Sequence, residues 1–340
     1  MKEIKVEDAV GEVLAHDITE IVIGEKKGPA FKKGHIVTAE DIPHLKNIGK
    51  EHLFVFEMDE SMLHENDAAF ILRDLCMGEN LTATDASEGK VELLALADGL
   101  LKIDRQRLYA INSLGEMMVA SRHGDTEVKK GDKIAGMRVI PLVIEAEKME
   151  RARAAAAGNG AVFNILPFAH KKIGIVITGS EILNGRIEDT FTPVLLKKLS
   201  AYDTEMIGME QTGDDRVRIA DTIRAMEENG AEIILCTGGM SVDPDDRTPA
   251  AIRDAAGEVI TYGAPVLPGA MFMLAYTKNG VPVMGLPGCV MYAKRTIFDL
   301  VFPRILAGER MSAEDFYGYG EGGLCLNCTP CTYPNCGFGK

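Results

Sequence analysis

Apolar runs of strand length that lead into glycine are the feature of this 340-residue chain that most constrains its fold. A continuous apolar run is typical of a strand that is buried on both faces of a sheet. Strand-like runs occupy residues 173–178 (IGIVIT), 204–210, 232–239 (EIILCTGG) and 281–285. Helical patterns alternate with them at residues 191–199, 214–229, 249–256 and 291–306. This alternation predicts an α/β domain over residues 171–308, with three layers and a mainly parallel sheet covered by helices on both faces.

The rest of the chain divides into smaller parts by composition. Residues 1–57 mix helical signals, strongest at residues 6–15, with turn signals and a short apolar strand, and predict a small α+β segment. Residues 58–150 carry β-branched runs separated by glycine, and predict a smaller β-rich domain. Residues 151–170 open on an Ala- and Gly-rich stretch that is typical of a linker or a helix end. Residues 309–340 form a cysteine-rich tail.

The formal net charge of −14 at pH 7 argues against a nucleic-acid partner, which would call for a basic face. Any phosphate-bearing ligand must then be held by backbone N–H groups, helix N-termini or a bridging cation. No apolar run approaches the ~20 residues that a membrane helix needs. Residues 1–14 carry charges throughout and lack the apolar core of a secretory signal. We therefore expect a cytoplasmic protein with no membrane partner.

Three glycine-bearing loops follow predicted strands, at residues 178–181 (TGSE), 237–241 (TGGMS) and 286–288 (LPG). In open α/β sheets, ligands bind beyond the carboxyl ends of the strands. Glycine lets the backbone approach an anion closely, and a following helix start offers free N–H groups. One such loop is ordinary turn chemistry, but three in one predicted domain indicate a site for a phosphorylated ligand.

Carboxylates follow the second loop closely. Asp243, Asp245 and Asp246 fall within four residues and would repel one another. Beside a phosphate loop they suit Mg²⁺, which proteins usually hold with one or two carboxylates plus phosphate oxygens. We therefore predict Asp243 and Asp246 as magnesium ligands. Asp214 and Asp215 open the predicted helix 214–229, where an acid is either a cap that stabilises the helix dipole or part of the site.

An ordered set of motifs is more specific than any single loop. These are residues 178–190 (TGSEILNGRIEDT), 213–215 (GDD), 236–246 (CTGGMSVDPDD), 267–271 (LPGAM) and 285–293 (GLPGCVMYA). The set resembles the molybdopterin-binding domain shared by molybdopterin molybdotransferases, molybdopterin adenylyltransferases and gephyrin. The GLPG element looks more like the molybdotransferase branch, and residues 246–249 (DRTP) look more like the adenylyltransferase branch. Residues 6–18 look like the opening of a molybdotransferase. Residues 32–56 are similar to the segment that precedes its pterin domain, but in this chain more than about 100 residues lie between the two.

The resemblance implies roles for the matching residues. Asp246 would be the essential acid, holding Mg²⁺ or positioning water, and Asp214 would be the acid at the preceding helix start. Residues 238–241 would cradle phosphate through backbone N–H groups, and two Pro-Gly pairs would form the far wall. The ligand-binding residues that it implies are Thr178, Gly179, Ser180, Glu181, Gly185, Asp189, Thr190, Gly238, Gly239, Met240, Ser241, Pro268, Gly269, Pro287 and Gly288.

The resemblance also implies a reaction. A molybdotransferase binds adenylyl-molybdopterin with Mg²⁺, hydrolyses its phosphoanhydride, releases AMP and inserts molybdate. An adenylyltransferase and a non-catalytic pterin carrier are the alternatives. The family pattern has lysines where this chain has Leu267 and Ala270, and Asn-Pro where it has Cys289 and Val290. The missing lysines favour a carrier, whereas the retained acids favour catalysis. The family further implies a homo-oligomer, with a molybdoenzyme as a candidate recipient of the cofactor.

Four cysteines near the end of the chain, Cys325, Cys328, Cys331 and Cys336, have the spacing C-x2-C-x2-C-x4-C. Thiolates this close in sequence can surround a tetrahedral Zn²⁺ or an iron–sulfur cluster. The ferredoxin run differs, because it has three residues before its last Cys and a Pro after it. Redox or thiol handling and a mobile tail without a role are the alternatives. Residues 317–323 (YGYGEGG) look like a flexible hinge before the four cysteines.

Overall fold

The computed structural model describes residues 2–22, 26–56 and 61–340 and divides the chain into two compact units. The first unit comprises Met1–Leu96, Ile103–Arg122 and Gly131–Asn164, and the second comprises Ala97–Lys102, His123–Lys130 and Ile165–Lys340. The boundary predicted between residues 57 and 58 lies outside the described residues. No helix in the described ranges is both long enough and apolar enough to cross a membrane.

The start of the first unit has its own small apolar core around Val6, Leu14, Leu45 and Leu53. Strands β1 and β4 pair antiparallel, as do β2 and β3. The helical signal of residues 6–15 yields only one short 3-10 turn, and the predicted apolar strand forms β4. The elements are β1 (Lys2–Lys5), η1 (Val6–Asp8), β2 (Ile18–Val22), β3 (Lys26–Phe31), α1 (Asp41–Asn47) and β4 (His52–Val55).

The remainder of the first unit is built on a four-stranded sheet in the order β6-β7-β11-β9 and on the pair β12-β5. Helix α2 begins where the His64 side chain accepts a hydrogen bond from the N–H of Asn66, and α3 begins at the cap Asp104. The elements are β5 (Met62–His64), α2 (Glu65–Cys76), β6 (Leu81–Ala83), β7 (Lys90–Ala95), α3 (Arg105–Asn112), β9 (Met117–Ser121), β11 (Lys133–Val139), β12 (Val143–Glu145) and α4 (Ala146–Ala156).

Regular structure occupies much of residues 151–170, where the sequence predicts a linker. Helix α4 continues to Ala156, and β13 (Phe163–Pro167) follows after a short turn. The Ala- and Gly-rich stretch between them is held by one side chain, because the guanidinium of Arg107 donates to the carbonyls of Ala156 and Gly160 at 3.1 and 2.7 Å. It also donates to the carbonyls of Asn159 and Ala161. Small residues therefore let the backbone close around Arg107 instead of forming a free linker.

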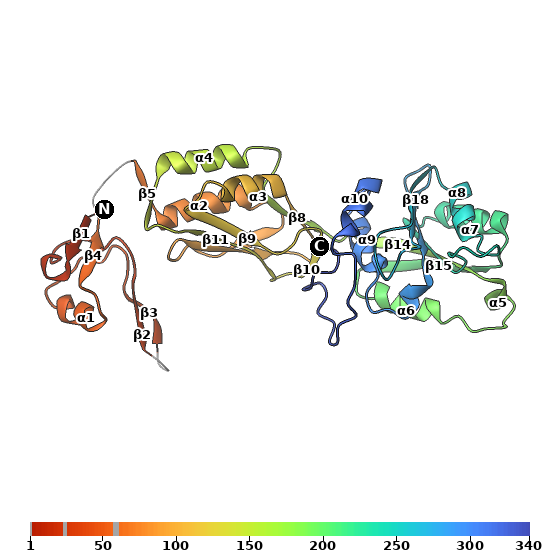
Figure 1. The fold of residues 1–340 in the computed structure, drawn as a ribbon, viewed down its shortest axis with the longest axis horizontal. Coiled ribbons are helices and arrows are strands. Elements are labelled where there is room, and N and C mark those ends of the chain that lie inside the picture. The colour runs from red at the N-terminus through yellow and green to blue at the C-terminus, as the bar shows by residue number, and fades with distance from the viewer. Residues whose placement is uncertain (1, 23–25, 57–60) are drawn as a thin grey trace. The chain divides into compact units, whose positions relative to one another are not determined.

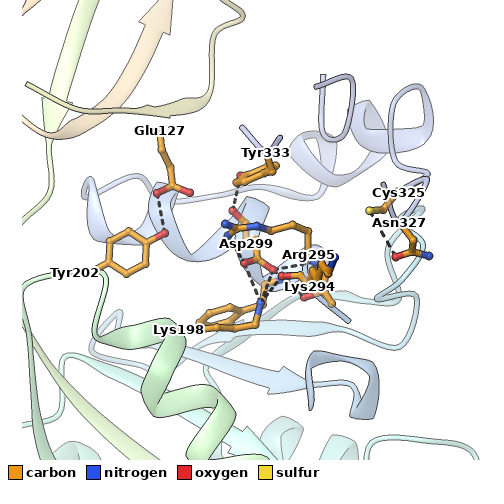
Figure 2. Close-up of polar contacts among 11 residues, drawn as sticks. Glu127, Lys198, Tyr202, Lys294, Arg295, Asp299, Cys325, Asn327 and Tyr333 are labelled. Atoms are coloured by element: carbon orange, nitrogen blue, oxygen red, sulfur yellow. Dashed lines mark hydrogen bonds and ion pairs between the residues drawn. The ribbon is translucent and has the colours of Figure 1, made fainter. Parts of the chain in front are cut away.

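Two segments of the predicted domain 58–150 pack with the second unit instead. Strands β8 (Gly99–Ile103) and β10 (Thr126–Val128) form a three-stranded sheet with β13, in the order β10-β8-β13. Within the second unit, the hydroxyl of Tyr202 donates to the Glu127 carboxylate at 2.9 Å (Figure 2). The composition of these strands is ordinary, so only their tertiary partners assign them to this unit.

Burial of the Glu127–Tyr202 pair makes its contribution to stability depend on pH. Burial raises the pKa of Glu127 above its ordinary value of 4.5, in spite of the hydrogen bond from Tyr202. A group whose folded pKa is raised contributes stability below its unfolded pKa, and that contribution is lost as pH rises through the folded pKa. Glu127→Gln should therefore be more stable than wild type at pH 7, with a difference that disappears near pH 4.

Urea unfolding at a series of pH values measures this difference, with Glu228→Gln, the same change on an exposed side chain, as the control. If the stability of Glu127→Gln varied with pH as the stability of wild type does, the raised pKa of Glu127 would be contradicted.

The second unit has the predicted fold. Its six-stranded sheet has the order β15-β14-β16-β19-β18-β17, and β15, β14, β16 and β19 are parallel. The elements are β14 (Lys171–Thr178), α5 (Ser180–Leu183), α6 (Phe191–Leu199), β15 (Thr204–Thr212), α7 (Arg216–Glu228), β16 (Ile233–Thr237), α8 (Thr248–Ala255), β17 (Glu258–Tyr262), β18 (Met273–Tyr276), β19 (Pro282–Leu286), η2 (Gly288–Met291), α9 (Ile297–Leu306), α10 (Ala313–Tyr317) and η3 (Gly318–Gly320).

Apolar cores on both faces of this sheet make the three layers. Ile175 of β14 packs with Leu195 of α6 and Phe298 of α9 on one face. Its neighbour Val176 packs with Ile219 of α7 on the other face. Figure 1 shows α7 and α8 on one side of the sheet and α6 on the other. Successive strand residues point to opposite faces, so an uninterrupted apolar run is what a sheet covered on both sides requires.

The structure differs from the sequence prediction at two places in this unit. Helix α9 begins at Ile297 rather than 291, because Thr296 and Asp299 form a capping box there and residues 288–291 form a 3-10 turn. The strands β17 and β18 were not predicted, and both are antiparallel to their neighbours. Strand β17 lies at the sheet edge with no buried residue, so it lacks the apolar run that marks the other strands.

Candidate functional site

A cavity of about 580 Å³ lies where β14, β16 and β19 reach their carboxyl ends. We call it the strand-end cavity. Its position is the one expected for ligands of open parallel sheets. The residues that line it are Thr178, Ile182, Ile187, Glu188, Asp189, Thr190, Phe191, Thr237, Gly238, Gly239, Met240, Ser241, Asp246, Ala270, Met271, Leu286, Pro287, Gly288, Cys289, Met291 and Tyr292.

Three buried threonines hold the loops around the cavity together. The hydroxyl of Thr178, at the end of β14, donates to the carbonyl of Thr237, at the end of β16, at 3.0 Å. It also lies 2.9 Å from the hydroxyl of Thr248, the first residue of α8. All three side chains are at most 1% exposed, so these bonds are shielded from water. They fix the start of α8 beside the two strand ends.

The glycines of the second loop are required by their surroundings. Gly238 and Gly239 have φ angles of +85° and +54°, in the left-handed region that favours glycine. A Cβ on Gly238 would lie 2.2 Å from the carbonyl oxygen of Thr178. Within the described residues, the N–H groups of Gly239, Met240 and Ser241 have no hydrogen-bond acceptor. This loop therefore offers backbone donors to an anion, as the sequence predicts.

Carboxylates face this cavity without cations. Glu188, Asp189 and Asp246 are among the lining residues, and no described lining residue is Lys or Arg. The carboxylate of Asp189 has a structural role, because it accepts hydrogen bonds from the N–H groups of Phe191 and Thr192 at the start of α6. An anionic ligand in this cavity would therefore depend on the backbone donors or on a divalent cation that bridges it to the carboxylates.

Asp246 is the carboxylate best placed to hold such a cation. One of its oxygens accepts the N–H of Asp243 at 3.1 Å, and its own N–H donates to the carbonyl of Asp243 at 2.9 Å. This turn holds Asp246 at the cavity, half-buried, while the Asp243 side chain is exposed and does not line the cavity. Proteins usually hold Mg²⁺ with one or two carboxylates plus substrate phosphate oxygens, and Asp246 would supply such a carboxylate.

Other predicted residues lie behind the lining. The carboxylate of Asp214 accepts the N–H of Ser180 at 2.9 Å, and the N–H of Asp214 donates to the Ser180 hydroxyl at 3.3 Å. Asp214 therefore positions the first loop, whereas Asp215 is the cap of α7. The residues outside the lining are Gly179, Ser180, Glu181, Gly185, Asp214, Asp243, Pro268 and Gly269. Those predicted residues that line it are Thr178, Asp189, Thr190, Gly238, Gly239, Met240, Ser241, Asp246, Pro287 and Gly288.

The Pro-Gly pair of the fourth motif has a packing role. A Cβ on Gly269 would lie 2.5–2.9 Å from atoms of Ile297, the first residue of α9. The carbonyl of Pro268 accepts the N–H of Ile297 at 3.3 Å. The wall itself is formed by the next two residues, Ala270 and Met271.

Several lining residues were not predicted. Glu188 lies inside the first motif, and Tyr292 lies inside the last, so proximity to the chosen positions was the available signal. Tyr292 lines the cavity and is 78% exposed, so its side chain is accessible to a ligand there. Lys294, a sequence candidate to replace the missing lysines, does not line the cavity, and its carbonyl accepts a hydrogen bond from Lys198.

The four cysteines of the tail line a second cavity in the same unit, of about 200 Å³. We refer to Cys325, Cys328, Cys331 and Cys336 as the cysteine quartet and to this space as the quartet cavity. All four are free thiols. Across residues 2–22, 26–56 and 61–340, no three His, Cys, Asp or Glu side chains come close enough together to hold a metal ion.

Fold and site together define the second unit as an α/β domain with a cavity at the carboxyl ends of its parallel strands. Two parts of the chain match known protein families. Residues 174–307 match a family described as "Probable molybdopterin binding domain", and residues 3–57 match one described as "Domain of unknown function (DUF8806)". Residues 174–307 are thus a domain of the molybdopterin-binding family, which the motifs also indicate.

Curated relatives match only part of the chain. A CinA-like protein of Mycobacterium tuberculosis is 33% identical over 86 residues, which are 25% of this chain and 20% of the relative. A CinA-like protein of Mycobacterium avium is 28% identical over 95 residues, or 28% of this chain and 22% of the relative. The matched part therefore spans about a fifth of the length of these relatives.

Solved structures also match part of the chain. The molybdopterin biosynthesis enzyme MoaB of Thermus thermophilus is 19% identical, with a TM-score of 0.35, over 41% of this chain and 98% of that one. The protein CinA of Thermoplasma acidophilum, whose function is unknown, is 18% identical, with a TM-score of 0.30, over 35% of this chain and 89% of that one.

Proposed function

We propose that the strand-end cavity binds a molybdopterin-type pterin through its phosphate, together with Mg²⁺, and that the chain acts on adenylyl-molybdopterin. The observation that carries this proposal is the set of free N–H groups of Gly239, Met240 and Ser241 beside the carboxylate of Asp246, within a molybdopterin-binding domain. Backbone donors recognise phosphoryl oxygens, and the carboxylate holds the cation that neutralises them.

In this proposal, different residues of the site have different roles in breaking a phosphoanhydride. The loop N–H groups donate to the phosphoryl oxygens, where negative charge increases in the transition state. Asp246 holds Mg²⁺, which when bound polarises the phosphoryl group. Apolar lining residues such as Ile182, Phe191 and Met271 shield the reacting group from bulk water. Thr178 and Thr248 keep the loops in register without contacting the reacting atoms.

The reaction that we favour is that of a molybdotransferase. Water attacks the adenylyl phosphorus, the phosphoanhydride bond breaks, AMP leaves, and molybdate is loaded onto the dithiolene of the pterin. The Pro287–Gly288 pair at the end of β19, which matches the molybdotransferase branch in sequence, lines the cavity and supports this choice.

An adenylyltransferase is the second candidate, and one observation favours it. Thr248, within the DRTP segment that looks like that branch, is completely buried and hydrogen-bonded to Thr178 in the loop framework of the cavity. The lack of lysine and arginine among the described residues around the cavity likewise gives molybdate no direct cationic partner. A pterin carrier, the third candidate, would need the same binding contacts without the chemistry.

One assay separates these three candidates. The full chain is mixed with adenylyl-molybdopterin, Mg²⁺ and molybdate, and AMP is followed by chromatography. AMP release that depends on both Mg²⁺ and molybdate is expected for a molybdotransferase. Formation of adenylyl-molybdopterin from ATP and molybdopterin would assign the adenylyltransferase instead. Binding without either reaction would leave the carrier, and absence of binding would contradict the whole proposal.

A further inference from the structure

The cysteine quartet belongs to a docked structure and not to a mobile tail. The N–H of Leu267 donates to the carbonyl of Gly323, and the N–H of Cys325 donates to the carbonyl of Leu267, both at 2.8 Å. At the far end, Phe338 is 5% exposed and packs into the core of the second unit. Residues 317–320, where a flexible hinge is predicted, instead end α10 and form η3. The segment is thus anchored on both sides of the quartet.

Close backbone contacts explain why glycines flank the quartet. A Cβ on Gly323 would lie 2.2 Å from the carbonyl oxygen of Pro265, and a Cβ on Gly339 would lie 2.4 Å from Leu300. The hydroxyl of Tyr333, between the third and fourth cysteines, donates to the carbonyl of Asp299 at 2.9 Å. These contacts fix the backbone of the loop that carries the thiols.

A half-buried cation lies beside the thiols. Arg295 lines the quartet cavity and lies over the ring of Tyr333, with its guanidinium carbon 4.6 Å from the centroid. Asp299, only 5% exposed, pairs with both Arg295 and Lys198 at 2.9 Å (Figure 2). Arg295 and Cys331 both line the quartet cavity.

We propose that the cysteine quartet binds an iron–sulfur cluster with four irons in the quartet cavity. The cavity is apolar between the thiols, with Leu324, Leu326 and Phe338 in its lining. Cluster-binding thiolates in such surroundings are shielded from water, and the adjacent Arg295 offsets the net negative charge of the bound cluster. This proposal is independent of the function proposed for the strand-end cavity.

Spacing and size favour a cluster over a zinc ion. Structural zinc sites typically combine two short Cys pairs that are separated by a longer stretch, whereas Cys325, Cys328 and Cys331 form one continuous run. Zinc lies about 2.3 Å from each sulfur and draws the four thiolates against one another. The four cysteines line a cavity of about 200 Å³, which has room for more than a single ion. A polynuclear cluster holds its thiolates farther apart.

The quartet cavity adjoins the strand-end cavity along the chain. Tyr292 lines the strand-end cavity, and Arg295, three residues later, lines the quartet cavity. At about 3.6 Å per residue, their Cα atoms are at most ~11 Å apart. Leu267, whose backbone pairs with the quartet segment, is likewise followed by Ala270 in the strand-end lining. Lining residues of the two cavities are therefore close neighbours in sequence.

Metal and sulfide analysis of the full chain tests the proposal. The chain is expressed with sufficient iron, purified without oxygen, and assayed for iron, acid-labile sulfide and zinc. About four irons and four sulfides per chain are expected, together with visible absorption that bleaches on reduction by dithionite. One zinc per chain without sulfide would overturn the proposal. So would a folded chain that contains no iron and takes up none when supplied with iron and sulfide.

Variants locate the cluster on the quartet. Cys328 and Cys331 are exposed, so replacing both by serine should leave the fold intact, as circular dichroism would show. This double variant should lose at least ~10-fold in bound iron. Cys289→Ser, in the strand-end cavity, is the control and should retain the iron. Equal iron in the double variant and wild type would overturn the assignment to these cysteines.

Discussion

Asp246→Asn should lower the rate of Mg²⁺-dependent AMP release from adenylyl-molybdopterin on the order of a hundredfold. The change removes the negative charge that we assign to the cation but keeps the size of the side chain. Its amide oxygen can still accept the N–H of Asp243, so the turn that presents the residue should survive. The rate is measured by chromatography of AMP at saturating ligand, with melting temperature as a check on folding.

The neighbouring acid provides a matched control for that experiment. Asp245 is exposed and does not line the strand-end cavity, so Asp245→Asn makes the same charge change one residue away. We expect its rate to stay within about twofold of wild type, because exposed charges outside such a site contribute little. If Asp246→Asn were as active as Asp245→Asn, Asp246 would not be the cation-holding residue.

Gly238→Ala should destabilise the second unit by about 3 kcal/mol, through left-handed backbone strain and steric overlap. The φ angle at this position is +85°, and the added Cβ would lie 2.2 Å from the Thr178 carbonyl oxygen. Relief of that overlap must separate the ends of β14 and β16, and with them the loop that offers free N–H groups. Thermal unfolding should therefore begin ~6–12 °C earlier, and affinity for the pterin phosphate should fall with it.

A second glycine of the same cavity provides the control, because replacing it by alanine should cause neither backbone strain nor steric overlap. Gly288 has no neighbouring atom within 4 Å of an added Cβ and no positive φ angle. Gly288→Ala should therefore change stability by no more than about 0.5 kcal/mol. Equal melting temperatures for the two variants would show that the Gly238 backbone is not constrained as the structure indicates.

We expect binding of a phosphorylated ligand in the strand-end cavity to depend on magnesium, because of the charges around that cavity. Glu188, Asp189 and Asp246 line it in the absence of any described lysine or arginine. A chain with a net charge of −14 repels a free phosphorylated ligand at long range as well. No basic face stands out in the sequence, and Asp246 is the lining residue to which we assign the bridging cation.

Local sequence by itself determined the architecture of the second unit. The uninterrupted apolar run of β14 requires cover on both faces, and helix-forming segments of matching length follow β14, β15 and β16. Parallel strands end at the same edge of a sheet, so their glycine loops were bound to meet there. That is why the Gly238–Gly239 loop, Asp246 and Pro287 could be predicted as neighbours from their order along the chain.

Only the tertiary structure decided which predicted residues face the cavity and which support it. Asp214 and Asp246 are both acids beside glycine loops, yet Asp214 accepts the N–H of Ser180 while Asp246 lines the cavity. The tertiary structure also decided the pairing of β8 and β10 with β13, which is distant in sequence. It likewise decided the docking of the tail, which depends on close contacts at Gly323 and Gly339. Motif order carries no information on side-chain direction or on long-range packing, because both depend on atoms that meet only after folding.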